Sequence, residues 1–110
     1  MNAEPPTKVI FRKLEKEVVA LFPEEPSSVS TWYWCSSYSH VGQHASADPE
    51  GVVSMSRPAR QEEYLPLMRE LERRGYNLYV RHRISPEMRA RRERQWRAWQ
   101  SMGSEVGNDY

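Results

Sequence analysis

Two runs of β-forming residues near the start of the chain constrain its fold most strongly. Residues 8–14 and 17–22 are separated only by the polar pair Glu15 and Lys16, a spacing typical of a β-hairpin. Within the second run, every position of the segment 18–22 is apolar, so both faces of this strand are apolar. A strand of this kind belongs inside a sheet rather than at its edge. The hairpin therefore predicts a sheet in which the second strand is central.

The rest of the chain predicts further strands and two helices around this hairpin. Pro23 and Pro26 should end the second strand, because proline cannot donate a hydrogen bond to a neighbouring strand. We expect further strands at residues 31–38, 52–55 and 77–84, helices at residues 61–74 and 86–100, and a polar loop at residues 39–51. This order predicts an α+β fold, with a mostly antiparallel sheet of about five strands and helices on one face or end of it.

Both expected helices carry signals at their ends. The amphipathic helix has apolar residues at helical spacing and a glycine, Gly75, where a C-cap belongs, although Pro66 removes one of its hydrogen bonds. The second helix begins with Ser85, Pro86 and Glu87, which suit its first turn, and it is rich in arginine and tryptophan. We expect a single domain over residues 7–100, between a disordered leader (1–6) and a disordered tail (101–110).

An aromatic stripe is expected on one face of the strand at residues 31–38. Period-two spacing places Trp32, Trp34 and Tyr38 on the same face. An exposed stripe of this kind can stack nucleic-acid bases, but tryptophans in a small domain usually pack in the core. We therefore expect these three side chains in the core.

The charges are unevenly divided along a chain of 110 residues. The net charge is +1, which excludes a uniformly basic nucleic-acid-binding protein. Residues 1–50 nevertheless carry four Lys or Arg against seven Asp or Glu, while residues 51–110 carry twelve against eight. No apolar run is long enough to span a membrane, and a single cysteine excludes an internal disulfide. These features predict a cytoplasmic protein that does not act at a membrane.

One candidate site groups potential metal ligands around the expected loop. Cys35, His40, His44 and Asp48 carry the thiol, imidazole and carboxylate groups that zinc selects. The same cysteine, or a neighbouring serine beside either histidine, is a candidate nucleophile, although no Gly-x-Ser-x-Gly elbow is present. The alternative is that Cys35 is an ordinary buried residue and that the histidines bond the loop to itself.

A second candidate site is the arginine-rich last third of the chain. Residues 77–100 contain seven arginines and only two acidic residues, with tyrosine and tryptophan among them. Guanidinium groups suit phosphates and carboxylates, so we expect a nucleic acid or an acidic protein surface to bind this part of the chain. The predicted partner-binding residues are Tyr79, Arg81, Arg83, Arg89, Arg91, Arg94 and Arg97.

The same helix has two simpler interpretations. Its charged face is equally typical of a solvated helix surface. Trp96 and Trp99, with Met88 and Arg92 on the same side, could form the seam that packs the helix on the sheet or on a second copy of the chain.

Several segments of the chain resemble a small uncharacterised protein family of bacteriophages, plasmids and conjugative elements. The resemblance covers about residues 8–84 and is carried by the segments 8–13, 17–24, 35–44, 47–48, 62–72 and 75–76, of which residues 37–44 (Ser-Tyr-Ser-His-Val-Gly-Gln-His) are the most specific. It implies a small accessory protein that binds host machinery, including defence systems, inside the host cell without catalysis. Arg60 departs from the serine or threonine expected at a helix start.

Three functions follow from these observations. The first is a non-enzymatic binding protein of a phage or mobile element, which counteracts a host defence through its arginine-rich third. The second is a small metal-binding or ligand-binding domain, or an enzyme, centred on residues 35–48. The third is an oligomer that assembles through Trp96 and Trp99.

Overall fold

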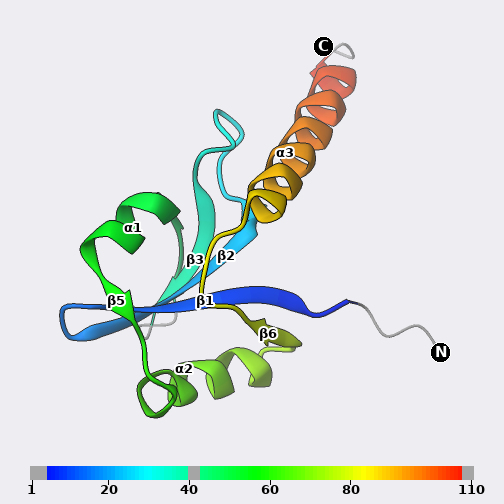
Figure 1. The fold of residues 1–110 in the computed structure, drawn as a ribbon. Coiled ribbons are helices and arrows are strands. Elements are labelled where there is room, and N and C mark those ends of the chain that lie inside the picture. Colours follow the sequence, from blue (N-terminus) through cyan, green and yellow to red (C-terminus); the bar gives the residue numbers. More distant parts are fainter. Residues whose placement is uncertain (1–4, 40–42, 108–110) are drawn as a thin grey trace.

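One sheet of six strands organises the molecule. The computed structural model describes residues 5–39 and 43–107 (Figure 1). The strands lie in the order β4-β3-β2-β1-β5, and β6 also pairs with β1. Their bounds are β1 Thr7–Leu14, β2 Glu17–Pro26, β3 Cys35–Ser39, β4 Gln43–Ala47, β5 Arg57–Pro58 and β6 Leu78–Val80. All pairings are antiparallel except that of β6 with β1. The α+β class and the mostly antiparallel sheet are thus confirmed.

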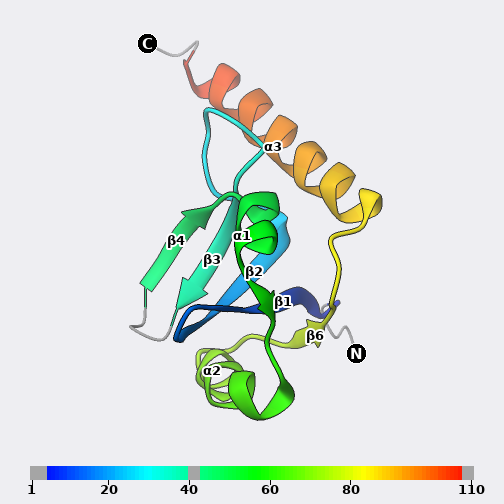
Figure 2. The ribbon, with the colours of Figure 1, turned by 60° about the vertical axis from the view of Figure 1, so that its left-hand side comes forward.

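Helices cover both faces of this sheet. They are α1 (Pro49–Met55), α2 (Gln61–Arg73) and α3 (Pro86–Gly107). Alternate residues of β1 point to opposite sides: Val9 packs with Leu67 and Leu71 of α2, whereas Ile10 packs with Met88 of α3. Figures 1 and 2 show α2 on one side of the sheet and α1 with α3 on the other. The expectation of helices on one face or end is therefore wrong, because the hairpin is apolar on both faces and each needs a cover.

The hairpin and the amphipathic helix form where the sequence predicts them. Leu67 and Leu71 of α2 are buried, and Tyr64 stacks on Phe11 of β1 with ring centroids 4.5 Å apart. Gly75 ends the helix with a φ of 104°, in the left-handed region that glycine adopts without steric cost. At the helix start the backbone N–H of Arg60 donates to Glu63, 2.8 Å away, which compensates for the missing Ser or Thr cap.

The sequence prediction is wrong between the hairpin and α2. Strand β2 continues through Pro23 to Pro26 with a shift of register, and β3 begins only at Cys35. The expected loop at residues 39–51 contains β4, and the expected strand at residues 52–55 lies in α1. Pro49 at the first helical position and Glu50 in the first turn favour this helix.

The last strand and the last helix also differ in length from the prediction. β6 has three residues, because only Leu78–Val80 pairs with β1. α3 begins as predicted, with the N–H of Met88 donating to the Ser85 hydroxyl at 3.2 Å, but it continues to Gly107. Residues 101–107, expected in a disordered tail, are therefore helical. The other residues of the expected leader and tail, 1–4 and 108–110, lie outside the described part.

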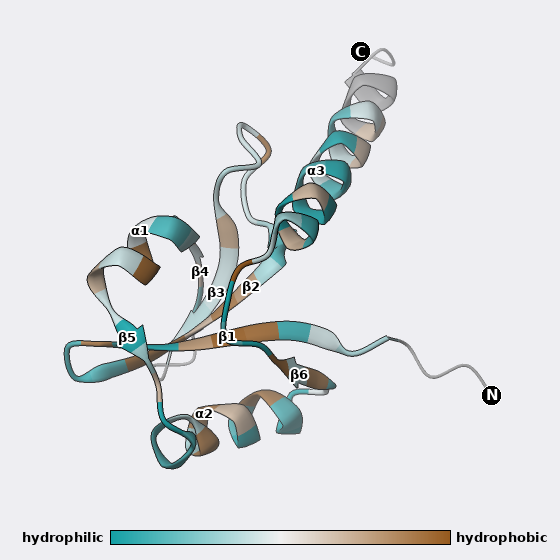
Figure 3. Cartoon of the chain, in the orientation of Figure 1, coloured by the Kyte–Doolittle hydropathy of each residue, from teal (hydrophilic) through white to brown (hydrophobic). Residues whose placement is uncertain are grey.

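Hydropathy follows this arrangement. Figure 3 shows apolar colour along the middle of β1 and on β6, and polar colour over much of α3. α3 packs on the sheet through Met88 and Arg92, both at most 2% exposed, whereas the other two residues of the predicted seam, Trp96 and Trp99, are only partly buried. Among the residues described, no helix combines the length and the apolar character of a membrane span.

Candidate functional site

The expected metal ligands do not converge. Cys35 lies opposite Ala47 in the β3–β4 pairing, and it packs with Met88 on the face that α3 covers. His44 lies opposite Tyr38, whose side chain packs on the face that α2 covers. Because Cys35 and His44 point to opposite faces of the sheet, they cannot hold one ion between them. Asp48 is exposed just before α1, and His40 lies outside the described residues. Within the described ranges, no three His, Cys, Asp or Glu residues are grouped as metal ligands.

The structure gives two of the expected nucleophiles, Cys35 and Ser37, a place in the packing and bonding of β3. Cys35 is fully buried, and burial raises the pKa of its thiol to about 12, so the thiolate is not populated near neutral pH. The Ser37 hydroxyl donates to the backbone oxygen of Ala45 at 3.1 Å. Cys35 and Ser37 therefore serve the packing and bonding of β3.

His44 belongs to a polar cluster that joins the sheet to α2. Its ring meets the Tyr38 ring edge-on, with the centroids 4.9 Å apart. The Tyr38 hydroxyl donates to the Glu70 carboxylate, which raises the pKa of Tyr38. The guanidinium of Arg74 lies 5.3 Å from the centroid of the Tyr38 ring. The cluster thus fixes the end of α2 against β3.

The expected aromatic stripe is divided between the core and the surface. Tyr38 is fully buried, as predicted, but Trp32 and Trp34 lie in the β2–β3 loop, and Trp34 is 47% exposed. The core prediction is therefore wrong for Trp34, because β3 starts one residue after it. The guanidinium of Arg92 lies 5.9 Å from the centroid of the Trp32 ring.

Arg92 is a buried arginine that holds α3 on the sheet. Its Nε donates to the Trp32 carbonyl at 2.8 Å, and its Nη1 donates to the Pro23 carbonyl at 2.9 Å. Further along α3, the Trp96 indole N–H donates to the Val29 carbonyl at 3.1 Å. Both side chains bind the β2–β3 loop within the chain, so the side of α3 that carries Trp96 is already engaged.

Three of the four arginines of α3 that were predicted to bind a partner, Arg91, Arg94 and Arg97, lie on its outward side, away from the buried Arg92. Successive helix residues turn by about 100°, so these three, each three residues from the next, are neighbours on that side. Three of the four arginines have carboxylate partners: Arg89 pairs with Glu50 at 2.7 Å, Arg97 with Glu93 at 2.7 Å, and Arg91 with Glu24 at 3.9 Å. Only Arg94 is exposed without an ion pair to a described residue. The positive charge on this side of the helix is therefore largely compensated by carboxylates within the chain.

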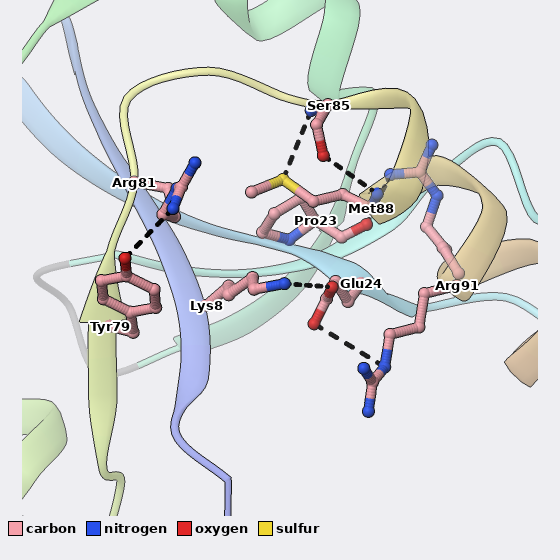
Figure 4. Close-up of polar contacts among 9 residues, drawn as sticks. Lys8, Pro23, Glu24, Tyr79, Arg81, Ser85, Met88 and Arg91 are labelled. Atoms are coloured by element: carbon pink, nitrogen blue, oxygen red, sulfur yellow. Dashed lines mark hydrogen bonds and ion pairs between the residues drawn. The ribbon is translucent and has the colours of Figure 1, made fainter.

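The three predicted residues before α3, Tyr79, Arg81 and Arg83, do lie together. With His82, which was not predicted, they form what we call the connector patch. The four residues are exposed, and the Tyr79 side chain is large and apolar. Arg81 lies against Tyr79, with its Nη1 donating to the Tyr79 hydroxyl at 3.1 Å and its guanidinium 5.3 Å from the ring centroid (Figure 4). Neither Arg81 nor Arg83 forms an ion pair with a described residue.

Lys8 and Glu24 connect this patch to α3. Lys8 lies beside Tyr79 in the register of β1 and β6. Its Nζ contacts Glu24 at 3.1 Å, and the same carboxylate reaches Arg91 from the other side (Figure 4). The sequence prediction missed Lys8 and Glu24, because their neighbours come from distant parts of the chain.

A hollow of 450 Å³, which we call the basic hollow, adjoins the connector patch between α1 and the start of α3. It is lined by Arg12, Glu50, Val53, Ser54, Pro58, His82, Arg83, Ile84 and Arg89. Arg12 is 6% exposed and was not among the predicted site residues. Its Nε donates to the Ser56 hydroxyl at 2.9 Å, and its Nη2 donates to the Val53 and Ser56 carbonyls at the end of α1. The sequence does contain a signal for Arg12. The residue lies two positions after Ile10, so period-two spacing places this charged side chain on the same strand face as an apolar one.

These observations define a candidate surface made of the connector patch and the basic hollow. It joins an exposed aromatic ring, cations without carboxylate partners and a partly apolar cavity. Such a surface can bind an anion that carries a flat or apolar group. Comparison of the chain with protein-family models, with curated proteins and with solved structures found no match to any of them.

Proposed function

We propose that the protein is a non-enzymatic binding protein whose connector patch binds single-stranded nucleic acid. The observation that carries this proposal is the pairing of the exposed Tyr79 ring with Arg81, beside a second exposed arginine at Arg83. Proteins that bind single strands combine cations for the phosphates with aromatic rings on which bases stack. An acidic protein surface would use the same cations, so the stacking of bases on the Tyr79 ring is the contact that distinguishes a nucleic-acid partner.

The extent of the patch limits the number of phosphates bound. Arg81 and Arg83 supply two cations, and Lys8 adds a third that is already shared with Glu24. For single strands, the logarithm of the binding constant falls with the logarithm of the salt concentration with a slope of about −0.7 per phosphate neutralised. We therefore expect a slope of about −1.4 to −2.

Fluorescence anisotropy with a labelled single-stranded oligonucleotide tests this proposal. The variant Arg81→Ala/Arg83→Ala should weaken binding at least tenfold and make the salt slope shallower by about 1.4. The separate variant Tyr79→Ala should remove base stacking and weaken binding by about 1–3 kcal/mol, while the slope of the salt dependence stays unchanged. The matched control is Arg69→Ala/Arg73→Ala, which removes the same charge from exposed positions of α2 on the other side of the sheet.

The pattern of results decides the proposal. Equal losses in the connector and α2 variants would show that binding follows net charge rather than the patch. If no oligonucleotide binds but an acidic peptide does, and the connector variant abolishes that binding, the partner is an acidic protein surface. Either result overturns the assignment to nucleic acid.

The setting of this activity is part of the proposal. Residues 37–44 carry a resemblance to a family of phages and mobile elements, and small proteins of such elements commonly act on host machinery. We propose on this basis that the protein acts in the cytoplasm of a host cell, against a defence system that handles nucleic acid. Capture from host lysate with and without nuclease tests this setting, because a partner held through nucleic acid is lost on nuclease treatment.

A homo-oligomer is the second candidate function, favoured by one observation. Tyr33, Trp34 and Met102 are 64%, 47% and 64% exposed, and large exposed apolar side chains are typical of interfaces. Trp99, which lines a second hollow of 690 Å³ together with Arg91 and Gln95, lies on the same helix as Met102. Light scattering tests this candidate: a dimer that Trp34→Ser dissociates supports it, and a monomer at high protein concentration removes it.

A further inference from the structure

The basic hollow is lined by a buried cation, Arg12, that has no carboxylate partner among the described residues. Arg12 is 6% exposed, and no carboxylate of the described residues lies within ion-pair distance of it. Its Nε and Nη2 are bonded to Ser56 and Val53, whereas Nη1, for which no bond is found among the described residues, is not fully buried. Buried charges are usually paired, because removing a charge from water costs several kcal/mol. A cation of this kind at the wall of a cavity favours an anionic ligand.

The charges around the hollow indicate the ligand's charge. Three guanidinium groups, those of Arg12, Arg83 and Arg89, and one carboxylate, that of Glu50, line it. Glu50 already pairs with Arg89 at 2.7 Å, so two guanidinium groups remain without a carboxylate partner. A phosphate monoester carries a charge of about −1.5 to −2 near neutral pH, which matches these two groups. The forked guanidinium suits phosphate oxygens, because its N–H groups can donate in pairs.

The remaining walls indicate what the phosphate is attached to. Val53, Pro58 and Ile84 supply an apolar wall, while the His82 ring and the Ser54 hydroxyl lie at the same hollow. The volume, 450 Å³, falls within the range of small-molecule pockets, about 300–1,000 Å³. An apolar wall with a ring and a hydroxyl is suited to a flat heterocycle that also forms hydrogen bonds at its edge.

We propose that the basic hollow binds a nucleoside monophosphate, either free or as the 5′-phosphorylated end of a nucleic-acid strand. The phosphate contacts Arg12 and Arg83, and the base lies against Val53 and Ile84. If the ligand is a strand end, this inference rests on the proposed function, because the connector patch then binds the nucleotides that follow the 5′-phosphate. The free nucleotide requires only the hollow.

Titration with adenosine monophosphate, followed by the methyl resonances of Val53 and Ile84, tests the site. The nucleotide should shift both residues in a saturable manner, whereas adenosine and inorganic phosphate at equal concentration should each bind at least tenfold more weakly. Arg83→Ala should weaken the binding of the nucleotide about tenfold or more, because it removes charge-assisted hydrogen bonds. Arg83 is exposed, so this variant should fold. The matched control Arg69→Ala, on α2, should bind as the unchanged chain does.

Two oligonucleotides that differ only in a 5′-phosphate separate the two sources and the two proposals. Tighter binding of the phosphorylated strand, lost in Arg83→Ala, assigns the hollow to a strand end. Equal binding of both strands, with methyl shifts caused by adenosine monophosphate, assigns it to the free nucleotide. The inference is overturned if the nucleotide shifts neither methyl group at millimolar concentration, even when both oligonucleotides bind at the connector patch. If adenosine monophosphate binds but neither oligonucleotide does, the proposed function is wrong and the nucleotide site in the basic hollow is supported.

Discussion

Replacing Arg92 with alanine tests whether a buried arginine holds the last helix on the sheet. The side chain is 2% exposed, and its guanidinium donates to the carbonyls of Pro23 and Trp32, at 2.9 and 2.8 Å. The two acceptors lie at the end of β2 and in the β2–β3 loop, 69 and 60 residues away in the sequence. One side chain therefore ties three parts of the chain together.

The expected loss of stability follows from these bonds. A hydrogen bond from a charged donor contributes about 1.5–3 kcal/mol, so the two together contribute about 3–6 kcal/mol. The variant also abolishes the desolvation of a buried cation, which offsets a part of this loss. We expect a net decrease of about 2–4 kcal/mol in the free energy of unfolding, a large part of the 5–15 kcal/mol of a typical domain.

Urea unfolding followed by far-UV circular dichroism measures this decrease. With an m-value of about 2 kcal/mol per molar urea, the midpoint should fall by about 1–2 M. Arg94→Ala is the matched control, because Arg94 is exposed two residues further along α3 and its loss should change the free energy of unfolding by less than about 0.5 kcal/mol. The reasoning is refuted if the two variants unfold at the same urea concentration.

Three further predictions concern the thiol, an acidic residue and two glycines. Because Cys35 is buried and its pKa is raised to about 12, a thiol reagent at neutral pH should label it only at the rate of unfolding, and rapid labelling of the folded chain contradicts this placement. The hydrogen bond from Arg57 holds the pKa of Glu63 at about 2, below its ordinary value of 4.5, so its contribution to stability is present above pH 4.5 and is lost as the pH falls toward 2. Glu63→Gln should accordingly flatten the pH dependence of the melting temperature in that interval, and an unchanged profile refutes the pairing. Gly75→Ala should destabilise the chain by about 1–2 kcal/mol, because its φ of 104° is strained for any other residue. Gly51→Ala within α1 should be neutral or stabilising by up to about 1 kcal/mol, because alanine favours a helix and the Asp48 carboxylate oxygen, 2.6 Å from the added Cβ, can turn aside. Equal losses of stability in the two glycine variants would contradict the different backbone conformations of Gly75 and Gly51.

Local sequence signals predict those elements whose structure depends on local spacing. The hairpin and α2 follow from apolar periodicity, and both form as expected. α1 was missed because a short run, residues 52–55, has strand composition, although Asp48, Pro49 and Glu50 before it are typical of a helix start. β6 is shorter than its alternation predicts, because its length is set by parallel pairing with β1, a contact between distant parts of the chain.

The candidate site could be predicted only in part, for the same reason. Tyr79 lies in β6 and Arg81 directly follows the strand, two residues further along, so their contact follows from period-two spacing in extended backbone. The roles of the other arginines depend on residues far away: Arg12 meets Ser56, and Arg91 meets Glu24. Composition predicts that arginine is abundant near the C-terminus, but it does not separate the arginines that hold the fold from those that remain available.

This separation determines how the protein can bind. Arg92 is bonded to two backbone carbonyls, and Arg89, Arg91 and Arg97 are paired with carboxylates, which leaves Arg12, Arg81, Arg83 and Arg94 without a described carboxylate or a complete set of bonds. The charge available to a partner is therefore small, and electrostatic attraction alone gives weak binding that ordinary salt suppresses. Tight binding then requires the short-range contacts that the Tyr79 ring and the basic hollow offer, and these depend on the shape and chemistry of the ligand. We therefore expect the protein to discriminate between ligands of equal charge, and a comparison of oligonucleotides with polyphosphate of matched length measures that discrimination directly.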